Sequence, residues 1–565
     1  MTSSRSSASS RAASRHDSSG IVAWRLVMGV AVAVPLGFLV VFFAWPALTL
    51  IAYGLGGAGE GGVDLAGLGH VLGAARTWRV AWMSIWMAAA GTAGSAVIGT
   101  ALAYVLYRLR FPGRLAARAF FSIPFVLPTV AVSAGFRSLF DRDGTLGFLG
   151  LDQTPAAVII AMIFFNISLV ARVVGSTWAH IDPAPEEAAR MLGASPLRAW
   201  WDVTRPRLMP SLASVSSIVF LYCATAYSLV LILGGRKVST IETEIYRETT
   251  QVFDLRAAAV LSLLQLVVVV GALLVARRAG MRGQAETGQV TRAVDRPVRG
   301  RDVWVLVLVG GGAALLTLAP LYEVIVRSLQ RDGQWTLANY RDLANDQATP
   351  ALATSVLAAL GLSARTAVFA ATFSLIIGCA IALVLGQRPQ TRWARRAQSV
   401  FDSFVMLPLG VSAVTVGFGF LLTMSKPPLD LASSGWLVPA AQATVAVPLV
   451  VRIVVPTVRS IDPRLREAAR MLGSSPVQVL AHIDGRFLAR PAAIGWGFAF
   501  AISMGEFGAT SFLVRPLTPT LPVVIYQLSG RPGAVEQGLA MSAAVLLSLV
   551  TAVVMIVVEH ARERS

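Results

Sequence analysis

Two glutamates, Glu187 and Glu467, lie in nearly identical charged segments of an otherwise apolar chain. The segment IDPAPEEAARMLGASP, residues 181–196, matches IDPRLREAARMLGSSP, residues 461–476, at twelve of sixteen positions. Each segment carries a carboxylate, two alanines and, four positions beyond the second alanine, a glycine. A single acid near a helix start is usually a solvated group that the helix dipole favours. The same Glu-Ala-Ala and glycine in both copies instead indicate a binding surface that the protein uses twice.

The repeated segment predicts two short helices separated by a glycine. Asp182 can cap the first helix, whose first turn holds Pro183, and Gly193 ends it. Ser195 followed by Pro196 is a strong start signal for the second helix. The other copy repeats these steps at Asp462, Pro463, Gly473, Ser475 and Pro476. A bent pair of short helices with one small apolar face is suited to entering a cleft on another protein.

The rest of the chain is composed for lipid rather than water. Hydrophobic residues make up 55% of the 565 residues and charged residues 14%, and the mean hydropathy is +0.67. A run of about eighteen or more apolar residues can cross about 30 Å of hydrocarbon. We therefore expect an all-α polytopic membrane protein with about twelve transmembrane helices. The expected spans are 26–53, 80–107, 119–140, 155–179, 208–234, 257–276, 302–326, 354–386, 399–424, 436–458, 491–514 and 535–558.

A shift of 280 residues aligns the two halves of the chain well beyond the charged segments. It places Arg172 over Arg452 inside predicted spans, and Leu127-Pro128 over Leu407-Pro408. Six spans in each half give both copies the same orientation, so the halves are predicted to be parallel six-helix repeats. Most of the 48 Lys and Arg residues fall in inner segments if both termini are cytoplasmic. The predicted organisation is a disordered cytoplasmic tail at 1–20, a first half at 21–278 containing the first loop at 181–206, a cytoplasmic linker at 279–301, and a second half at 302–565 containing the second loop at 461–486.

Composition and motifs argue against several other functions. The net charge of +18 lies largely in short predicted inner loops, which favours a topology signal over nucleic-acid binding. Neither of the two lysines, Lys237 and Lys426, lies in a glycine-rich phosphate-binding loop. The five histidines are scattered, and no His, Cys, Asp or Glu cluster has metal-ligand spacing. We therefore expect no bound metal, no nucleic-acid partner and no ATP site in this chain.

Glu-Ala-Ala followed after three residues by glycine resembles the cytoplasmic EAA loop of permease subunits from bacterial ATP-binding-cassette (ABC) importers. In that family an Ile-x-Leu-Pro sequence follows. The first copy keeps Val203 and Pro206 but has Arg205 in place of leucine, and the second keeps Ile483 but lacks the Leu-Pro. The positions that match the motif are Glu187, Ala188, Ala189, Gly193, Glu467, Ala468, Ala469 and Gly473.

This resemblance implies a fold like that of type I ABC importer permeases. Each loop would dock on one copy of a separate homodimeric ATPase subunit on the cytoplasmic side, which would use ATP and Mg. The chain itself would have no catalytic residue and no bound cofactor, and it would lie in the plasma membrane with lipid around it. An extracytoplasmic solute-binding protein would deliver the cargo.

Two further segments are similar to the ferric-iron and thiamine importer permeases. They are LILGGRKVSTIETEIYRET, residues 231–249, and GEFGATSFLVRPLTPTLPVVIY, residues 505–526. The outer segment that begins GGRKVST favours ferric iron, with thiamine next. The alternative is an ion-coupled secondary transporter, which can also be built from two six-span halves. Such coupling usually needs buried acids near the midplane, and Glu506 has no counterpart in the first half.

Polar residues within the predicted spans are candidates for the transport path, because they are costly in lipid. Glu506 is flanked by glycines, where helices can approach or the backbone can break, and an ion pair with an arginine of another span explains it equally well. Arg172 and Arg452 lie before the two loops and could form an inner gate or extend to the interface. Asn166 and Tyr227 are lesser candidates, for which packing in the core is the alternative.

Overall fold

A computed structural model describes residues 24–56, 64–281, 296–298, 300–345, 352–387, 389, 391–424, 427, 429–431, 434–515 and 517–563. The predicted tail at 1–20 and most of the predicted linker at 279–301 lie outside these ranges. The described chain is almost wholly helical. Its sheet structure consists of short pairs: β1 (Leu109–Arg110) runs parallel to β2 (Arg296–Pro297), and β3 (Gln330–Arg331) runs antiparallel to β4 (Gln334–Trp335).

Ten helices in the described residues are long and apolar enough to cross a membrane, and two bent helix pairs raise the number to twelve if each pair is one span. This confirms the prediction of an all-α polytopic protein with about twelve spans. The ten are Trp24–Gly56, α4 (Ala75–Arg108), α7 (Pro155–Ala179), Pro196–Ala224 ending in α10 (Arg205–Ala224), α13 (Leu255–Met281), Asp302–Ser328 from α14 (Arg301–Val305) into α15 (Gly311–Ser328), α17 (Val356–Leu385), α20 (Leu437–Ser460), Pro476–Gly505 ending in α23 (Gly485–Gly505), and α26 (Ala534–Glu563).

The predicted spans 119–140 and 399–424 are not straight helices. In the first half, α5 (Arg114–Val126) and α6 (Thr129–Phe140) meet at 92°, and in the second, α18 (Arg392–Met406) extended by η8 (Leu407–Gly410) meets α19 (Ala413–Met424) at 98°. Leu127 is extended, with ψ 139°, immediately before Pro128. Proline offers no backbone N–H and disfavours a helical conformation of the preceding residue, so the first bend follows from the Leu-Pro pair.

The chain packs as two compact units, each assembled from non-contiguous segments. The larger unit comprises Leu50–Leu360 and Arg515–Leu549, and the smaller unit comprises Met1–Thr49, Gly361–Val514 and Val550–Ser565. Both units therefore mix residues of the two sequence halves. Within the larger unit, α15 packs on α6, so the first span of the second half joins helices of the first. Within the smaller unit, the Phe42 and Phe420 rings stack 6.0 Å apart, so the first span of the chain joins helices of the second half.

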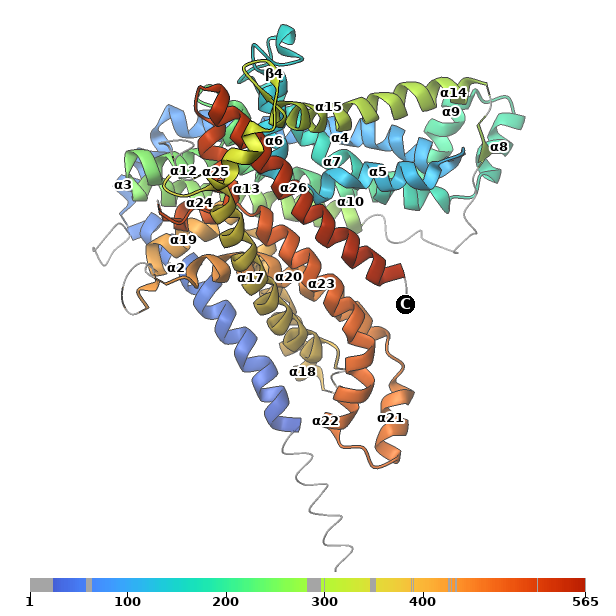
Figure 1. The fold of residues 1–565 in the computed structure, drawn as a ribbon. Coiled ribbons are helices and arrows are strands. Elements are labelled where there is room, and N and C mark those ends of the chain that lie inside the picture. The colour runs from blue at the N-terminus through green and yellow to red at the C-terminus, as the bar shows by residue number, and fades with distance from the viewer. Residues whose placement is uncertain are drawn as a thin grey trace, which may run out of the picture. The chain divides into compact units, whose positions relative to one another are not determined.

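Small residues set the spacing of the main helix pairs. In the larger unit α4 runs along α7 and α10 (Figure 1). A Cβ added at Gly99 of α4 would lie 2.6 Å from the Cβ of Val170, and one at Gly175 of α7 would lie 2.2 Å from the Tyr107 ring. In the smaller unit α20 packs along α23, and a Cβ added at Gly378 of α17 would lie 2.6 Å from Val450. Small residues let transmembrane backbones approach closely, and the resulting van der Waals packing helps to hold helices together in lipid.

Candidate functional site

The first loop follows α7 and contains the two short helices predicted for it. They are α8 (Ala184–Met191) and α9 (Pro196–Ala199), and a π-helical turn, η3 (Trp200–Thr204), leads from α9 into α10. The carboxylate of Asp182 accepts the N–H of Ala184 at 3.0 Å, and the hydroxyl of Ser195 accepts the N–H of Arg198 at 3.3 Å. Both predicted caps are therefore present, and they satisfy backbone donors that the helix leaves unpaired.

The second loop repeats this construction after α20. It holds α21 (Pro463–Met471), α22 (Pro476–Val479) and the π-helical η10 (Leu480–Asp484), which continues into α23. Asp462 accepts the N–H of Arg464 at 3.0 Å. Ser475 and Gln478 form a reciprocal cap, in which Oγ of Ser475 accepts the Gln478 N–H at 3.3 Å and Oε1 of Gln478 accepts the Ser475 N–H at 2.8 Å.

A glycine in the left-handed region ends the first helix of each loop. Gly193 has φ +91° and Gly473 has φ +85°. The N–H of Ala194 then reaches back to the carbonyl of Ala189 at 3.0 Å, and the matched Ser474 N–H reaches the Ala469 carbonyl at 3.0 Å. This is the Schellman closure of a helix, which favours glycine because a side chain is strained at positive φ. The repeated glycine therefore has a structural requirement in both copies.

The most exposed apolar side chains of the two loops lie at the end of this first helix. Met191 is 88% exposed and Leu192 90%, and the matched Met471 and Leu472 are 88% and 86% exposed. Glu187 and Ala188, like their counterparts in the second loop, are also exposed. Apolar groups held in water at matched positions are typical of a surface that meets a partner. The sequence analysis did not single out the Met-Leu pair, although its repetition in both copies was a visible signal.

A side-chain contact fastens each loop to the start of the next span, at positions that the 280-residue shift makes equivalent. In the first loop the Thr204 hydroxyl donates to the carboxylate of Glu186. In the second, Nε of Arg466 donates to Oδ1 of Asp484 at 2.8 Å, with the two side chains 18% and 6% exposed. The connection is thus a neutral-donor hydrogen bond in one copy and an ion pair in the other. The sequence analysis missed these four residues, because positions 186 and 466 differ in charge and the contacts span eighteen residues.

The two predicted gate arginines lie on exposed faces of the helices that lead into the loops. Arg172 is exposed on α7 and Arg452 is exposed at the matched position of α20. They belong to different packing units. Asn166 is buried six residues before Arg172 on α7 and donates to the carbonyl of Met162 at 2.8 Å. Tyr227 is buried at the start of α11 (Tyr227–Gly234), with its ring 5.7 Å from that of Tyr246.

Glu506 lies at a break in the backbone immediately after α23. It is 7% exposed, and its carboxylate accepts the N–H of Ala509 at 2.7 Å, the N–H of Thr510 at 3.0 Å and the hydroxyl of Thr510. These donors lie at the start of α24 (Thr510–Leu513). The carboxylate therefore joins the end of one helix to the start of the next, with backbone and hydroxyl donors in the place that the sequence analysis considered for an arginine.

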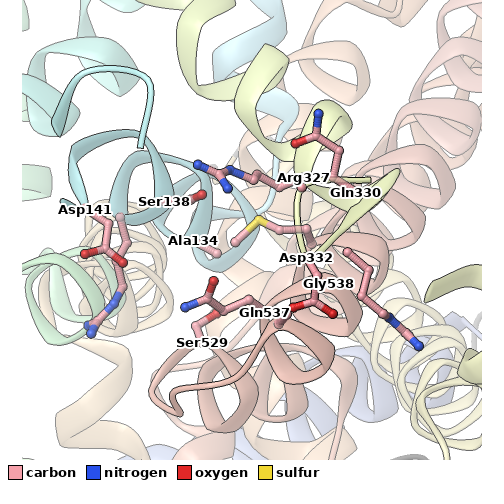
Figure 2. Close-up of a pocket in the computed structure, with 14 residues that line it drawn as sticks. Ala134, Ser138, Asp141, Arg327, Gln330, Asp332, Ser529, Gln537 and Gly538 are labelled. Atoms are coloured by element: carbon pink, nitrogen blue, oxygen red, sulfur yellow. The ribbon is translucent and has the colours of Figure 1, made fainter. Parts of the chain in front are cut away.

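The larger unit has a polar cavity at the end of α15. This end of α15 lies away from α8 and α9 (Figure 1). The cavity has a volume of about 70 Å³, and Ser138, Arg327, Gln330 and Gln537 surround it (Figure 2). Arg327 forms an ion pair at 2.9 Å with Glu323, a buried residue that also accepts the hydroxyls of Ser138 at 3.2 Å and Thr145 at 2.6 Å. The remaining charged residues of the lining are Arg137, Asp141, Arg331 and Asp332.

A second polar cluster in the larger unit lies on α12 (Ile241–Arg247), between the spans that end at Ala224 and begin at Leu255. Glu244 is buried, accepts a hydrogen bond from Arg76, and pairs with Arg247 at 2.7 Å. Burial raises the pKa of the Glu244 carboxyl, but the two arginines outweigh it and hold that pKa below its ordinary value. Burial raises the pKa of the neighbouring Glu248, although Arg247 also pairs with it.

Comparison with known proteins matches both halves of the chain to the same family. A family model described as "Binding-protein-dependent transport system inner membrane component" matches residues 95–280 and again residues 374–564. The thiamine transport system permease protein of Brucella abortus is 28% identical over 486 residues, which are 84% of this chain and 85% of that protein. That of Escherichia coli is 28% identical over 468 residues, 80% and 84% of the two chains. A probable ABC transporter permease protein of Sinorhizobium fredii is 24% identical over 533 residues, 87% and 90% of the two chains.

Proposed function

The chain belongs to the family of binding-protein-dependent transport system inner membrane components, with one family region in each half, and from this premise we propose that its cargo is thiamine. As a fused permease of an ABC importer it is a transport protein rather than an enzyme. The observation that carries the choice of cargo is the similarity to thiamine permeases over more than four-fifths of the chain. The expectation of ferric iron depended on one outer segment, so we now rank ferric iron second.

We propose that the two loops are the docking sites for a homodimeric ATPase, one loop on each copy. Support comes from their equivalence: each presents an exposed glutamate, an exposed alanine and a Met-Leu pair at the end of a capped helix. The ATPase would bind ATP and Mg, and the permease would bind neither. We keep the residues of the motif as docking candidates and add four exposed neighbours, Met191, Leu192, Met471 and Leu472. The motif residues are Glu187, Ala188, Ala189, Gly193, Glu467, Ala468, Ala469 and Gly473.

This arrangement assigns the loops to the cytoplasm, together with both termini and the linker at 279–301. The cavity beside Arg327 would then face the outside, where a solute-binding protein delivers the cargo. We keep Arg172 and Arg452 as gate candidates and Asn166, Tyr227 and Glu506 as path candidates. Reporter fusions at both termini test this orientation, and an extracytoplasmic signal from either one contradicts it.

The experiment that tests the cargo and the dependence on ATPase docking uses cells from which the chromosomal gene for this permease has been deleted. We expect the wild-type chain to restore uptake of labelled thiamine but not of ferric iron, and the Glu187→Ala/Glu467→Ala double variant to remain in the membrane without restoring uptake. Restored iron uptake, with thiamine uptake no higher than in cells without the chain, would contradict thiamine as the cargo. Full thiamine uptake by the double variant would overturn the assigned role of the two glutamates in docking.

A further inference from the structure

The smaller unit contains a groove of about 490 Å³ between α18 and the helix that begins at Trp24. This volume lies in the range of about 300–1,000 Å³ that small-molecule pockets occupy. The lining is apolar apart from one arginine near the start of α18. The lining residues are Leu36, Trp393, Arg396, Ala397, Val400, Phe401 and Phe404.

The helix that forms one wall of the groove is held in place by its polar face. The side-chain amide of Gln398 donates to the carbonyls of Val384 and Leu385 at 3.0 Å each, at the end of α17. The side chains along the groove are instead largely exposed: Trp393 is 79% exposed and Val400 is 69% exposed. A fixed helix thus presents an apolar face that no side chain of the described residues covers.

The charge at the mouth of the groove is positive. Arg392, Arg395 and Arg396 lie in the first two turns of α18 and are exposed, and Trp393 lies among them. Arginine and tryptophan beside an apolar face are typical of the membrane interface, where the ring and the guanidinium reach headgroups while the rest contacts acyl chains. Clustered arginines attract anionic lipids in particular.

The matched helix of the first half shows what fills this space when protein does so. In α5, Phe121 is 6% exposed and belongs to a cluster that Phe120 and Ala117 join, together with Val309 and Ala314 of the span Asp302–Ser328. The 280-residue shift places Ala116 at the position of Arg396 and Phe120 at that of Val400. The second copy therefore has a smaller side chain where the first packs an aromatic ring, and an arginine where the first has alanine.

We propose that the groove is a binding site for one anionic phospholipid. Its acyl chain lies along Leu36, Val400 and Phe404, and its phosphate pairs with Arg396. The site requires neither the cargo nor the ATPase docking proposed above, since it depends only on the membrane location of the chain. Neutral lipid and detergent are the other possible occupants, and the test separates them by headgroup charge.

The experiment measures lipid retained by the purified full-length protein, by native mass spectrometry in mixed micelles of phosphatidylglycerol and phosphatidylcholine. We expect one phosphatidylglycerol per chain. Arg396→Ala should lower its apparent affinity about fivefold, the effect of one arginine at a lipid surface. Val400→Phe introduces the residue type of the matched Phe120 into the groove, and it should displace the lipid although Arg396 is retained. Arg395→Ala is the matched comparison, because Arg395 belongs to the same arginine cluster but does not line the groove, and it should lower the affinity clearly less than Arg396→Ala does.

Three outcomes would overturn the proposal. Equal retention of phosphatidylcholine shows that headgroup charge plays no part. An equal loss in the Arg395→Ala and Arg396→Ala variants shows diffuse attraction rather than a site. Unchanged retention in Val400→Phe, with the protein still monodisperse, shows that the acyl chain does not occupy the groove.

Discussion

The exposed Met-Leu pairs give the sharpest test of the docking surface. We expect the Met191→Ala/Leu192→Ala variant to lose most of its affinity for the ATPase, because these side chains, 88% and 90% exposed, have little other role. Each substitution removes three heavy atoms. At about 0.8 kcal/mol per buried methylene, each change costs about 2 kcal/mol if docking buries the side chain fully. The pair then contributes about 4 kcal/mol, on the order of a thousandfold in affinity, or about thirtyfold if half of that surface is buried.

The assay is binding of the purified cognate ATPase to the permease in nanodiscs, with the second loop intact or carrying Met471→Ala/Leu472→Ala. Substitutions at such exposed positions should leave the unfolding free energy within about 0.5 kcal/mol of wild type. The matched control is Phe148→Ala, which removes an 81% exposed ring between α6 and α7, at the opposite end of α7 from the first loop. Equal losses of affinity in the control and in the loop variant would show that general surface hydrophobicity, not these loops, sets the affinity.

Three other predictions concern the loops and the polar cluster on α12. Arg466→Ala should lower the unfolding free energy by roughly 3–5 kcal/mol by leaving Asp484 buried without its partner, whereas Arg466→Met/Asp484→Leu should recover most of it; chemical unfolding checks this, and equal effects of the two variants would contradict the ion pair. Gly473→Ala should cost roughly 1–2 kcal/mol at φ +85° and weaken ATPase binding, and Gly473→Asn should cost less; equal binding by all three proteins would show that the left-handed turn is not needed for docking. Because the folded pKa of Glu244 lies below its ordinary value of 4.5, its contribution to stability should be complete above pH 4.5 and disappear as pH falls through the lower folded pKa; the difference in unfolding midpoint between wild type and Glu244→Gln measures this, and a difference independent of pH would refute it.

The sequence predicted the features that local physics controls. Span number follows from the thickness of hydrocarbon, and the structure and the family match confirm both the polytopic helical fold and the resemblance to importer permeases. The caps at Ser195 and Ser475 and the turn at Gly193 follow from backbone hydrogen bonds and steric limits that act within a few residues. These rules need no knowledge of distant contacts, so a single sequence is sufficient.

Features that depend on tertiary packing were beyond the same reasoning. Hydropathy is blind to a 92° bend, since a broken span is as apolar as a straight one, although Leu127-Pro128 was already visible as a repeated pair. The packing of each half's first span with helices of the other half was likewise hidden, because hydropathy does not specify which apolar helices pack together. Glu506 was recognised as unusual, but its donors lie on the backbone of Ala509 and Thr510 and become predictable only after the break in the helix is known.

The two loops share their outer surface but differ in how they are fastened, and this difference has a consequence for coupling. A homodimeric motor would meet the same Met-Leu pair, glutamate and glycine on each side, so we expect binding to be nearly symmetric. Behind that surface, Glu186 meets a threonine hydroxyl, whereas Arg466 meets a buried carboxylate. Both contacts have a carboxylate acceptor, but only the second adds the attraction between opposite charges in a largely buried place, so the second loop should follow α23 more rigidly than the first follows α10. Replacing the Arg466 pair with Glu and Thr, as in the first loop, should therefore leave ATPase affinity unchanged and lower the transport per ATP hydrolysed; a fall in affinity with unchanged transport per ATP would show that the fastening shapes the surface instead.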